Sequence, residues 1–378
     1  MKISFVGDVS FTGSFLNKIN EEGSNAKVIS KDILEILSSS DYTVCNLEGP
    51  VTNEKCILST KLNVKSPPET ISFLKKIYIN VFGLANNHMF DADYKGFTDT
   101  RRELIKNDVH FFGAGDDIKE ASKISYLKKD DITVAIIGVG HNVGKVAKEK
   151  KYGIFSYVDI NVLEKQISVA KKNSDWILIF FHAGPEYNFF PTPSVRERMK
   201  SILSKGADII VGHHPHVMQG VEYFNNNKLI IYSLGNFIFD LKSTSNKKGY
   251  NIGLIASIYF TKNKISVGTQ PVFIDTHRGV VKFAKEEHKE NFKNRSNFAD
   301  LEKKNAKDSF RCLFLNPILP KKINFKFFIY IIFYPVLTLY KLYNVKGYNR
   351  EFLDVFLKYY RINLLKKLFK KDDFYKYN

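Results

Sequence analysis

Two periods of apolar and polar positions alternate along the first half of the chain. Short apolar runs are typical of buried strands, whereas apolar spacings of three and four residues are typical of helices. The predicted strands are 2–7, Tyr42–Asn46, Asn80–Leu84, Val109–Phe112, Ile132–Val139, Trp176–Phe181 and Ala207–Val211. The predicted helices are Ser30–Leu37, a helix that Ser66 caps, Gly96–Asn107, Asp159–Lys172 and Ser194–Leu203.

The second half of the chain has a different pattern, in which alternating runs follow one another closely. These runs lie near 217–224, 228–233, 252–260 and 264–274, with turn residues between them. Closely spaced alternating runs are typical of hairpins, and strands that alternate with helices are typical of parallel sheets. The sequence therefore predicts an α/β fold with a pair of mixed sheets flanked by helices.

A cluster of histidines follows one of the predicted strands. Residues Val211 to Val217 read Val-Gly-His-His-Pro-His-Val and hold three of the nine histidines. A chain that leaves a sheet edge there presents His214 and His216 toward one point, and imidazole is the commonest neutral metal ligand. The alternative is a surface loop that is merely rich in histidine.

Other predicted strands also end in side chains that bind metals or transfer protons. They are Asp8, Asn46 with Glu48, Asn87 with His88, and His182 with Glu186. Each group alone is explained as well by a helix cap, a turn or a core histidine. Sites in open α/β sheets form outside the carboxyl ends of strands. Five groups at strand ends, the histidine cluster included, therefore predict one polynuclear metal centre.

Composition narrows the range of partners. The net charge of +18 favours an anionic partner, either nucleic acid, acidic lipid, or a phosphorylated or polyanionic substrate. Nucleic acid is not expected, because the sequence holds no recognition motif for it. The cysteines are Cys45, Cys56 and Cys312, an odd number without paired spacing, which argues against a disulfide framework and a cysteine zinc site.

The last part of the chain is basic and aromatic. Residues 321–378 hold 13 Lys and Arg against 4 Asp and Glu, a net charge of +9. We predict a main domain over 1–275, a linker or exposed segment over 276–320, and an amphipathic helical tail over 321–378. The tail is either an in-plane membrane anchor or a helical cap on the main domain. The chain enters a strand directly after Met1, which predicts a cytoplasmic location, with peripheral attachment to the inner membrane surface as a further expectation.

Over residues 1–275 the sequence resembles the capsule-synthesis CapA family of poly-γ-glutamate capsule biosynthesis proteins, which are related to calcineurin-like metallophosphoesterases. The resemblance implies a four-layer αββα sandwich and a site for one or two divalent ions, with Mn, Fe, Zn and Mg not distinguished. The motifs that carry it are Gly7-Asp8, Asn46-Leu47-Glu48, Ala85-Asn86-Asn87-His88 with Asp91, His182-x-Gly184-x-Glu186, Gly212 to Val217, and Ser233-Leu234-Gly235-Asn236-Phe237.

The resemblance also implies a role for each matched residue. It makes Asp8 and His216 ligands of a first metal, Asn87, His182 and His214 ligands of a second, and Glu48 a bridge between them. It makes His88 the acid beside the leaving group, with Asp91 orienting its ring. The residues that it places beside the ligands or the substrate are Asn46, Asn86, Glu186, His213 and Asn236.

One departure from the phosphoesterase pattern bears on function. Those enzymes have Asp-x-His at the first strand end, whereas Asp8 is followed here by Val9 and Ser10. From the resemblance we predict a metal-dependent hydrolase, phosphoesterase-like, that acts on an anionic polymer or a lipid-linked substrate in surface-polymer synthesis, although the missing histidine favours a subunit without catalysis. The alternatives are a polymer-binding or assembly subunit without catalysis, and an amide hydrolase of a γ-glutamyl polymer.

Overall fold

The computed structural model describes residues 1–57, 64–141, 144–225, 227–241, 247 and 249–296. The chain divides into two units, Met1–Asp308 and Ser309–Asn378, and all described residues lie in the first. The predicted tail over 321–378 and the later part of the 276–320 segment lie outside the described residues. Among the helices that the structure describes, none is long and apolar enough to cross a membrane.

The first of two large sheets has eight strands. Its order is β16-β15-β14-β1-β2-β3-β4, and β13 also pairs with β1. The strands β1 to β4 and β13 run parallel, and β14 to β16 form an antiparallel extension. The strands are β1 (Lys2–Val9), β2 (Tyr42–Leu47), β3 (Val81–Gly83), β4 (His110–Phe112), β13 (Asn236–Ile238), β14 (Ile252–Phe260), β15 (Ile265–Asp275) and β16 (Val280–Phe283).

The second large sheet has six strands in the order β11-β12-β10-β9-β7-β6. Its four inner strands are parallel, and both edge strands are antiparallel to their neighbours. The strands are β6 (Ser125–Lys129), β7 (Ile132–Gly140), β9 (Trp176–His182), β10 (Ile209–His213), β11 (Val221–Asn225) and β12 (Lys228–Ile231). A small sheet pairs β5 (Ala114–Gly115) with β8 (Gly153–Ile154).

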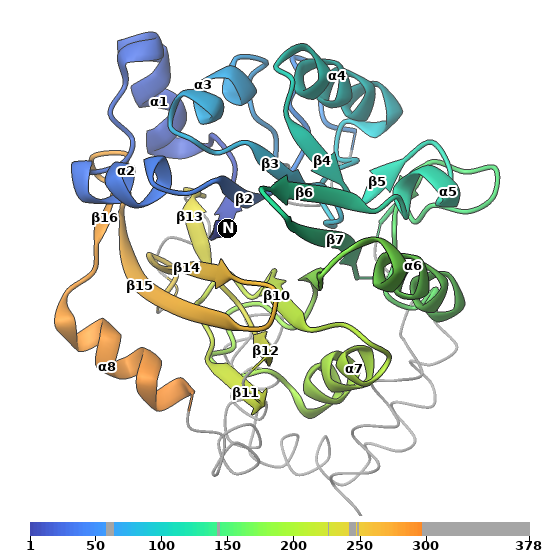
Figure 1. Ribbon diagram of the computed structural model, residues 1–378. Coiled ribbons are helices and arrows are strands. Elements are labelled where there is room, and N and C mark those ends of the chain that lie inside the picture. The colour runs from blue at the N-terminus through green and yellow to red at the C-terminus, as the bar shows by residue number, and fades with distance from the viewer. Residues whose placement is uncertain (58–63, 142–143, 226, 242–246, 248, 297–378) are drawn as a thin grey trace, which may run out of the picture. The chain divides into compact units, whose positions relative to one another are not determined.

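Helices cover the outer faces of both sheets (Figure 1). The described helices are α1 (Gly13–Glu22), α2 (Lys31–Ser38), α3 (Thr70–Lys76), α4 (Asp93–Lys106), α5 (Ile118–Ala121), α6 (Ile160–Asn173), α7 (Pro193–Ser204) and α8 (Glu286–Arg295), with a 3-10 turn at Gly23–Asn25. Buried side chains of α1 to α4 form one core with the outer face of the first sheet. Those of α6 and α7 form another with the outer face of the second sheet.

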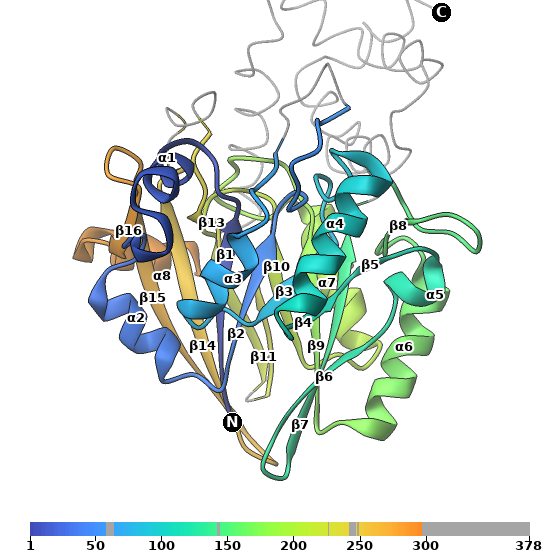
Figure 2. The ribbon, with the colours of Figure 1, turned by 90° about the horizontal axis from the view of Figure 1, so that it is seen from above.

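A third core fills the space between the two sheets, whose strands are drawn from above in Figure 2. Strand β7 shows how the period of two builds these layers. Val134 and Ile136 face the first sheet, and Ala135 and Ile137 face α6 and α7. Successive side chains of a strand point to opposite faces, so a wholly apolar run supplies two cores at once. The predicted four-layer αββα sandwich is confirmed.

Two predicted helix starts are wrong. Helix α3 begins at Thr70, and the hydroxyl of Ser66 accepts a hydrogen bond from the Phe11 amide at 2.8 Å instead of capping the helix. Helix α7 is capped by Thr192, whose hydroxyl accepts from the Val195 amide. The Ser66 hydroxyl is therefore used by a contact with a distant segment. At α7 the capping residue is Thr192, two residues before the predicted Ser194.

The segment predicted as a linker contains two described elements. Strand β16 pairs with β15, so the first sheet continues to Phe283, past residue 275. Helix α8 is polar over most of its surface, but Phe292 is buried in the core between the sheets. The domain boundaries at 275 and 320 stay predictions.

Candidate metal centre

The register of the strands brings the predicted residues together. In the first sheet, Asp8 at the end of β1 pairs with Asn46 of β2 and with Asn236 of β13. In the second sheet, His182 of β9 pairs with His213 of β10. The carboxyl ends of the parallel strands of both sheets thus carry these side chains, and contacts between Asp8 and His213 join the two sheets.

Two glycines let the strands carry these residues so close together. Gly7 precedes Asp8, and a Cβ built on it would lie 2.0 Å from the carbonyl oxygen of Gly235. Gly212 precedes His213, and a Cβ there would lie 2.0 Å from the carbonyl oxygen of Tyr232. Neither position has room for a side chain, so the glycines of both motifs are required by close backbone approach.

The carboxylate of Asp8 is fully buried and held at one oxygen. Asn46 Nδ2 donates to Asp8 Oδ1 at 2.9 Å, and His213 Nδ1 lies 3.2 Å from the same oxygen. The second oxygen, Oδ2, lies 3.2 Å from His216 Nδ1. One carboxylate oxygen is therefore fixed by neighbours, and the other faces the imidazoles.

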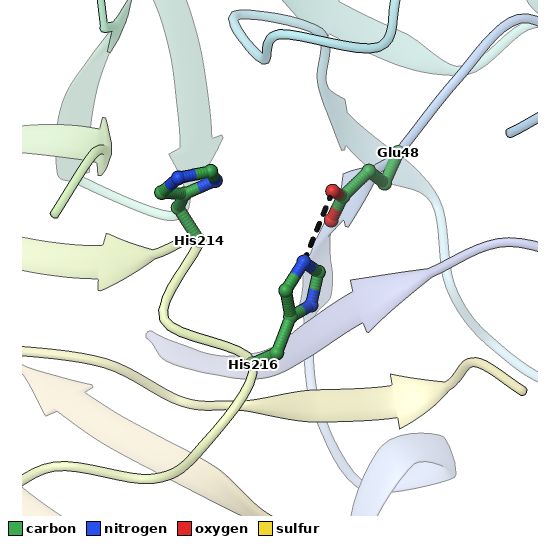
Figure 3. Close-up of side chains that lie close together, drawn as sticks. All are labelled: Glu48, His214 and His216. Atoms are coloured by element: carbon green, nitrogen blue, oxygen red, sulfur yellow. Dashed lines mark ion pairs between the residues drawn. The ribbon is translucent and has the colours of Figure 1, made fainter. Parts of the chain in front are cut away.

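Glu48 lies between the two groups of ligand atoms that the described residues form. Potential ligand atoms of Glu48, His214 and His216 lie within 4.8 Å of one another, and so do those of Asp8, Glu48 and His182. Figure 3 shows the side chains of Glu48 and His216 pointing toward each other, with Glu48 Oε1 3.5 Å from His216 Nε2. Because Glu48 belongs to both groups, its position is that of a bridge.

The second nitrogen of His216 is held by Asn236. His216 Nδ1 and Asn236 Oδ1 are 2.9 Å apart, and Asn236 Nδ2 donates to the carbonyl oxygen of Tyr250 at 3.0 Å. An amide oxygen that accepts from one imidazole nitrogen leaves the other nitrogen as the one that can bind a metal once it has lost its proton. Asn236 therefore aims His216 Nε2 at Glu48.

The segment that follows β3 supplies Asn87 and His88. Asn87 Oδ1 lies 2.9 Å from His182 Nε2, so these two potential ligand atoms are adjacent. Asp91 Oδ2 lies 2.7 Å from His88 Nδ1 and accepts from the Val64 amide at 3.0 Å. Asn86 Oδ1 accepts from the His88 amide at 3.2 Å. Asp91 thus contacts one ring nitrogen of His88, and the role that the resemblance gives to this pair stays a prediction.

Burial and mutual charge set opposite protonation states across the cluster. Burial raises the pKa of Glu48 to about 8, although the His216 charge opposes it. Burial lowers the pKa of His216, but the charges of Glu48 and Asp8 outweigh this and raise it to about 10. Burial, together with the charge of His216, lowers the pKa of His214 to about 3.

The other titratable groups follow the same physics. Burial, with the charge of His214, lowers the pKa of His182 well below its usual value. Burial alone would raise the pKa of Asp8, but the imidazoles of His213 and His216 hold it well below its usual range. Burial lowers the pKa of His88, and its bond to Asp91 offsets this so that the net shift is upward. His182 and His214 are thus neutral, which is the form that binds metal.

Unpartnered buried atoms test whether these residues suit a metal. Across the described residues, ten buried side-chain atoms have no hydrogen-bond partner, and half of them lie in this cluster. They are Asp8 Oδ2, Glu48 Oε1, His182 Nδ1, His213 Nε2 and His214 Nδ1. Buried polar atoms are nearly always paired, because leaving one unpaired costs about 1–3 kcal/mol. Carboxylate oxygens and imidazole nitrogens that are buried without a partner fit a divalent cation.

The backbone of the histidine motif is strained at the ligands. His214 has φ 92° and His216 has φ 55°, in the left-handed region that residues with a Cβ rarely adopt. Such conformations persist where surrounding contacts impose them, and they concentrate at functional sites. His214 and His216 lie on either side of Pro215, and in these conformations their ligand atoms lie within 4.8 Å of one another and of that of Glu48.

The structure gathers the predicted residues around Glu48, with one of them at the rim of the cluster. Glu186 is exposed, and its charge acts on Glu48 and His216 from the rim. His141 was missed by the sequence reasoning. It follows β7 directly, its amide donates to the His182 carbonyl at 2.9 Å, and its charge acts on His214. Its place after an apolar strand is the same signal that selected the others.

The aromatic neighbours of His216 were missed as well. The ring of Phe239 stacks on His216 at 5.0 Å between ring centres, and the ring of Tyr187 lies 6.1 Å away. Neither has a sequence signal, because tertiary contacts alone bring these rings to the histidine.

Comparisons with known proteins identify the family to which the chain belongs. The family model described as "Bacterial capsule synthesis protein PGA_cap" matches residues 2–241. "PGA biosynthesis protein CapA" of Bacillus subtilis (strain 168) is 36% identical over 245 residues, which are 64% of this chain and 63% of that protein. "Capsule biosynthesis protein CapA" of Bacillus anthracis is 33% identical over 257 residues, 65% of this chain and 62% of that protein. The chain thus spans less than two thirds of the length of these relatives.

Among solved structures, a putative 5'-nucleotidase from Staphylococcus aureus in complex with alpha-ketoglutarate aligns with a TM-score of 0.45. It is 14% identical and covers 79% of this chain and 59% of that one. A likeness at this level carries no weight for function.

Fold and site together define the class: an α/β sandwich with a carboxylate–imidazole cluster where the parallel strands of both sheets end. Within that class, the chain belongs to the family of bacterial capsule synthesis proteins PGA_cap. The predicted membership of the CapA family is confirmed.

Proposed function

We propose that this chain is a divalent-metal-dependent phosphoesterase in the synthesis of a capsule or other surface polymer. One observation carries the proposal. Glu48 is shared by two groups of ligand atoms, each within 4.8 Å, at an edge where buried ligand atoms have no partner among the described residues. A shared carboxylate between two ligand sets is the arrangement that a two-metal hydrolase needs.

The ligand sets suit two ions but differ in detail from those that the resemblance implies. By distance, His214 groups with His216, and Asp8 groups with His182. Asn87 joins the second set through His182. The assignment of each ligand to one ion therefore stays a prediction. Divalent ions held here would polarise a phosphoryl oxygen and lower the pKa of a bound water.

The protein's own residues supply the remaining chemistry. His88 Nδ1 is held by Asp91, so its Nε2 is the atom that presents a proton to a departing alkoxide. His182 and His214 stay neutral in their buried surroundings and bind without first losing a proton. Asn46 and His213 fix one oxygen of Asp8 and leave the other for an ion.

The names of the relatives and the charge of the chain suggest the substrate class. We propose a phosphorylated or lipid-linked intermediate of an anionic polymer, because the net charge of +18 attracts polyanions. Relatives are named for capsule and PGA biosynthesis. Cleavage of an amide in a γ-glutamyl polymer would use the same ligands. Attachment to the inner membrane surface through residues 321–378 is a further proposal, which liposome flotation of the full chain against a chain that ends at Lys321 tests.

A second candidate function has one observation in its favour. Ser10 occupies the position where phosphoesterases carry a first-strand histidine, and its hydroxyl bonds to Ser66 at 3.1 Å, away from the cluster. The first ion would therefore have one imidazole fewer. A chain in which this loss abolishes turnover would be a polymer-binding or assembly subunit.

An assay separates the two candidates. Purified chain is loaded with Mn²⁺, its metal content is measured, and hydrolysis of bis(p-nitrophenyl) phosphate is followed. His214→Ala is expected to reduce turnover by about 10²-fold or more, because it removes a direct ligand. His277→Ala is the matched control, since His277 is exposed on the β15–β16 hairpin. Wild-type chain with less than one ion bound and no turnover would support the assembly subunit instead.

A further inference from the structure

The loop that follows β9 holds its position beside His216 in a strained conformation. Tyr187 has φ 60°, its amide donates to the Pro215 carbonyl at 2.8 Å, and its ring faces the His216 ring at 28°. A tyrosine adopts a left-handed conformation only where its surroundings impose it. Contacts from other segments also hold the residues that follow Tyr187 in this loop.

Arg295, the last residue of α8, contacts this loop from outside. The centre of its guanidinium lies 4.2 Å from the centre of the Phe189 ring. Its Nη1 donates to the carbonyl oxygen of Met218 at 2.6 Å. Guanidinium groups stack on aromatic rings and donate from a planar fork, so one arginine can hold two segments at once. Here it joins the loop after β9 to the segment that leaves His216.

The end of α8 is itself fixed by the core and not by the loop. Phe292 is buried between the two sheets, and the hydroxyl of Ser296 accepts from the Val221 amide at 3.0 Å. A Cβ on Gly220 would lie 2.1 Å from the Arg295 carbonyl oxygen, so the two backbones touch. The backbone at the end of α8 is thus fixed by contacts with the core, and the Arg295 side chain extends from it to the loop.

A second contact ties the same two segments together. Gln219 Nε2 donates to the Asn188 carbonyl at 2.7 Å, and Gln219 is buried. The loop therefore has contacts on both sides of Asn188, through Tyr187 to Pro215 and through Phe189 to Arg295. The family model matches residues 2–241 only, so the contact from α8 lies beyond the matched region.

We infer that Arg295 is a positioning residue that holds the loop from Glu186 to Phe190 against the metal centre. It acts through the Phe189 ring and the Met218 carbonyl, and it keeps Tyr187 and Glu186 at the rim where a substrate enters. The structural part of this inference is independent of the proposed function. Its effect on substrate binding rests on that function.

Amide hydrogen exchange tests the structural part in the full chain. Arg295→Met keeps the aliphatic stem and removes the charged fork, and we expect exchange of the Tyr187 amide to accelerate about tenfold through local opening. Arg295→Lys is expected to restore part of the protection. Arg278→Met is the control, because Arg278 is exposed on the β15–β16 hairpin. Phe189→Leu removes the ring with the helix intact and should reproduce the acceleration, even if Arg295→Met does not fold.

Kinetics test the consequence for substrate binding. Arg295→Met is expected to raise KM for the phosphodiester several-fold, because a loop at the rim is no longer held in place. Its metal content should equal that of the wild type, which a general loss of structure would not allow. Equal Tyr187 exchange in wild type, Arg295→Met and Phe189→Leu would overturn the inference. Absent turnover in the wild type would instead reject the proposed function, and the exchange result would still decide the role of Arg295.

Discussion

Two polar clusters, one partly buried on the second sheet and one buried where the two sheets meet, differ in whether their atoms are paired. One joins α7 to the sheet edge through Arg196, Glu222 and Tyr232. Arg196 donates to both carboxylate oxygens of Glu222, at 2.9 and 2.5 Å, and the Tyr232 hydroxyl donates to one of them at 2.6 Å. Every ligand-type atom of Glu222 thus has a partner, and the cluster is complete as it stands.

The cluster around Glu48 is more deeply buried and is incomplete among the described residues. Glu48 Oε1, Asp8 Oδ2 and His214 Nδ1 lack hydrogen-bond partners there. Both clusters contain a carboxylate and cations or imidazoles, so composition alone does not separate them. Pairing is therefore the feature that separates the two clusters. Buried polar atoms are normally paired, so the unpaired atoms around Glu48 support our proposal that this cluster binds an ion.

The largest expected effect comes from changing the shared carboxylate. Glu48→Gln keeps the shape but removes the charge that both ligand sets use. We expect turnover to fall by about 10²-fold or more, and Mn²⁺ to lose its stabilising effect. In the wild type, saturating Mn²⁺ should raise Tm by about 5 °C, since a ligand that binds only the folded state stabilises it.

Scanning calorimetry with and without Mn²⁺ measures this effect. Glu197→Gln is the matched control, because Glu197 is exposed on α7. The comparison between the clusters fails if Glu48→Gln gains as much from Mn²⁺ as the wild type does.

The affinity for a metal ion should rise with pH, because His216 must lose a proton before it can bind the ion. With its pKa at about 10 in the metal-free chain, His216 carries a proton at pH 7, and an ion must displace it. Affinity for Mn²⁺ should therefore rise with pH, by about tenfold per pH unit for each proton released. Titration calorimetry in two buffers of different ionisation enthalpy counts these protons. Binding without proton release between pH 6 and 8 would exclude His216 as a ligand.

The smallest expected effect lies in the paired cluster and concerns stability alone. Burial raises the pKa of Glu222, but the bond from Arg196 outweighs this, so the folded-state pKa is lowered. The stabilisation is therefore present above the unfolded pKa of about 4.3 and is lost as pH falls through the lower folded value. Glu222→Gln should cost about 2 kcal/mol at pH 7 and progressively less in acid.

Urea unfolding at pH 7 and at acid pH measures this difference. Turnover and metal content of Glu222→Gln should stay those of the wild type, because no ligand is touched. A loss of bound Mn²⁺ would show that the two clusters are coupled.

The sequence predicted the site better than it predicted its surroundings, for a physical reason. Asp8, Glu48 and His182 follow apolar strands, and parallel strands end at a common edge, so local patterns were enough to bring them together. His141 carries the same signal and was overlooked. The ring of Phe239 and the left-handed Tyr187 depend on contacts between distant segments, which no local pattern encodes.

For the fold as well, local patterns predicted the elements, and contacts between distant segments were missed. Apolar strands of both sheets were recognised from their composition, and their predicted bounds lie within a few residues of the observed ones. The segment that contains β16 and α8 is predicted from its Lys, Glu and Asn to be a linker or an exposed segment. A few apolar anchors, Val281 and Phe292 among them, suffice to dock it.

The central claim is that the cluster around Glu48 binds divalent ions, and anomalous diffraction from crystals grown with Mn²⁺ tests it most directly. The account predicts an anomalous peak at about 2.1–2.3 Å from Glu48 Oε1, shared with His214 or His216. Crystals that show no peak there, with Glu48 and His216 bonded directly to each other, would contradict it.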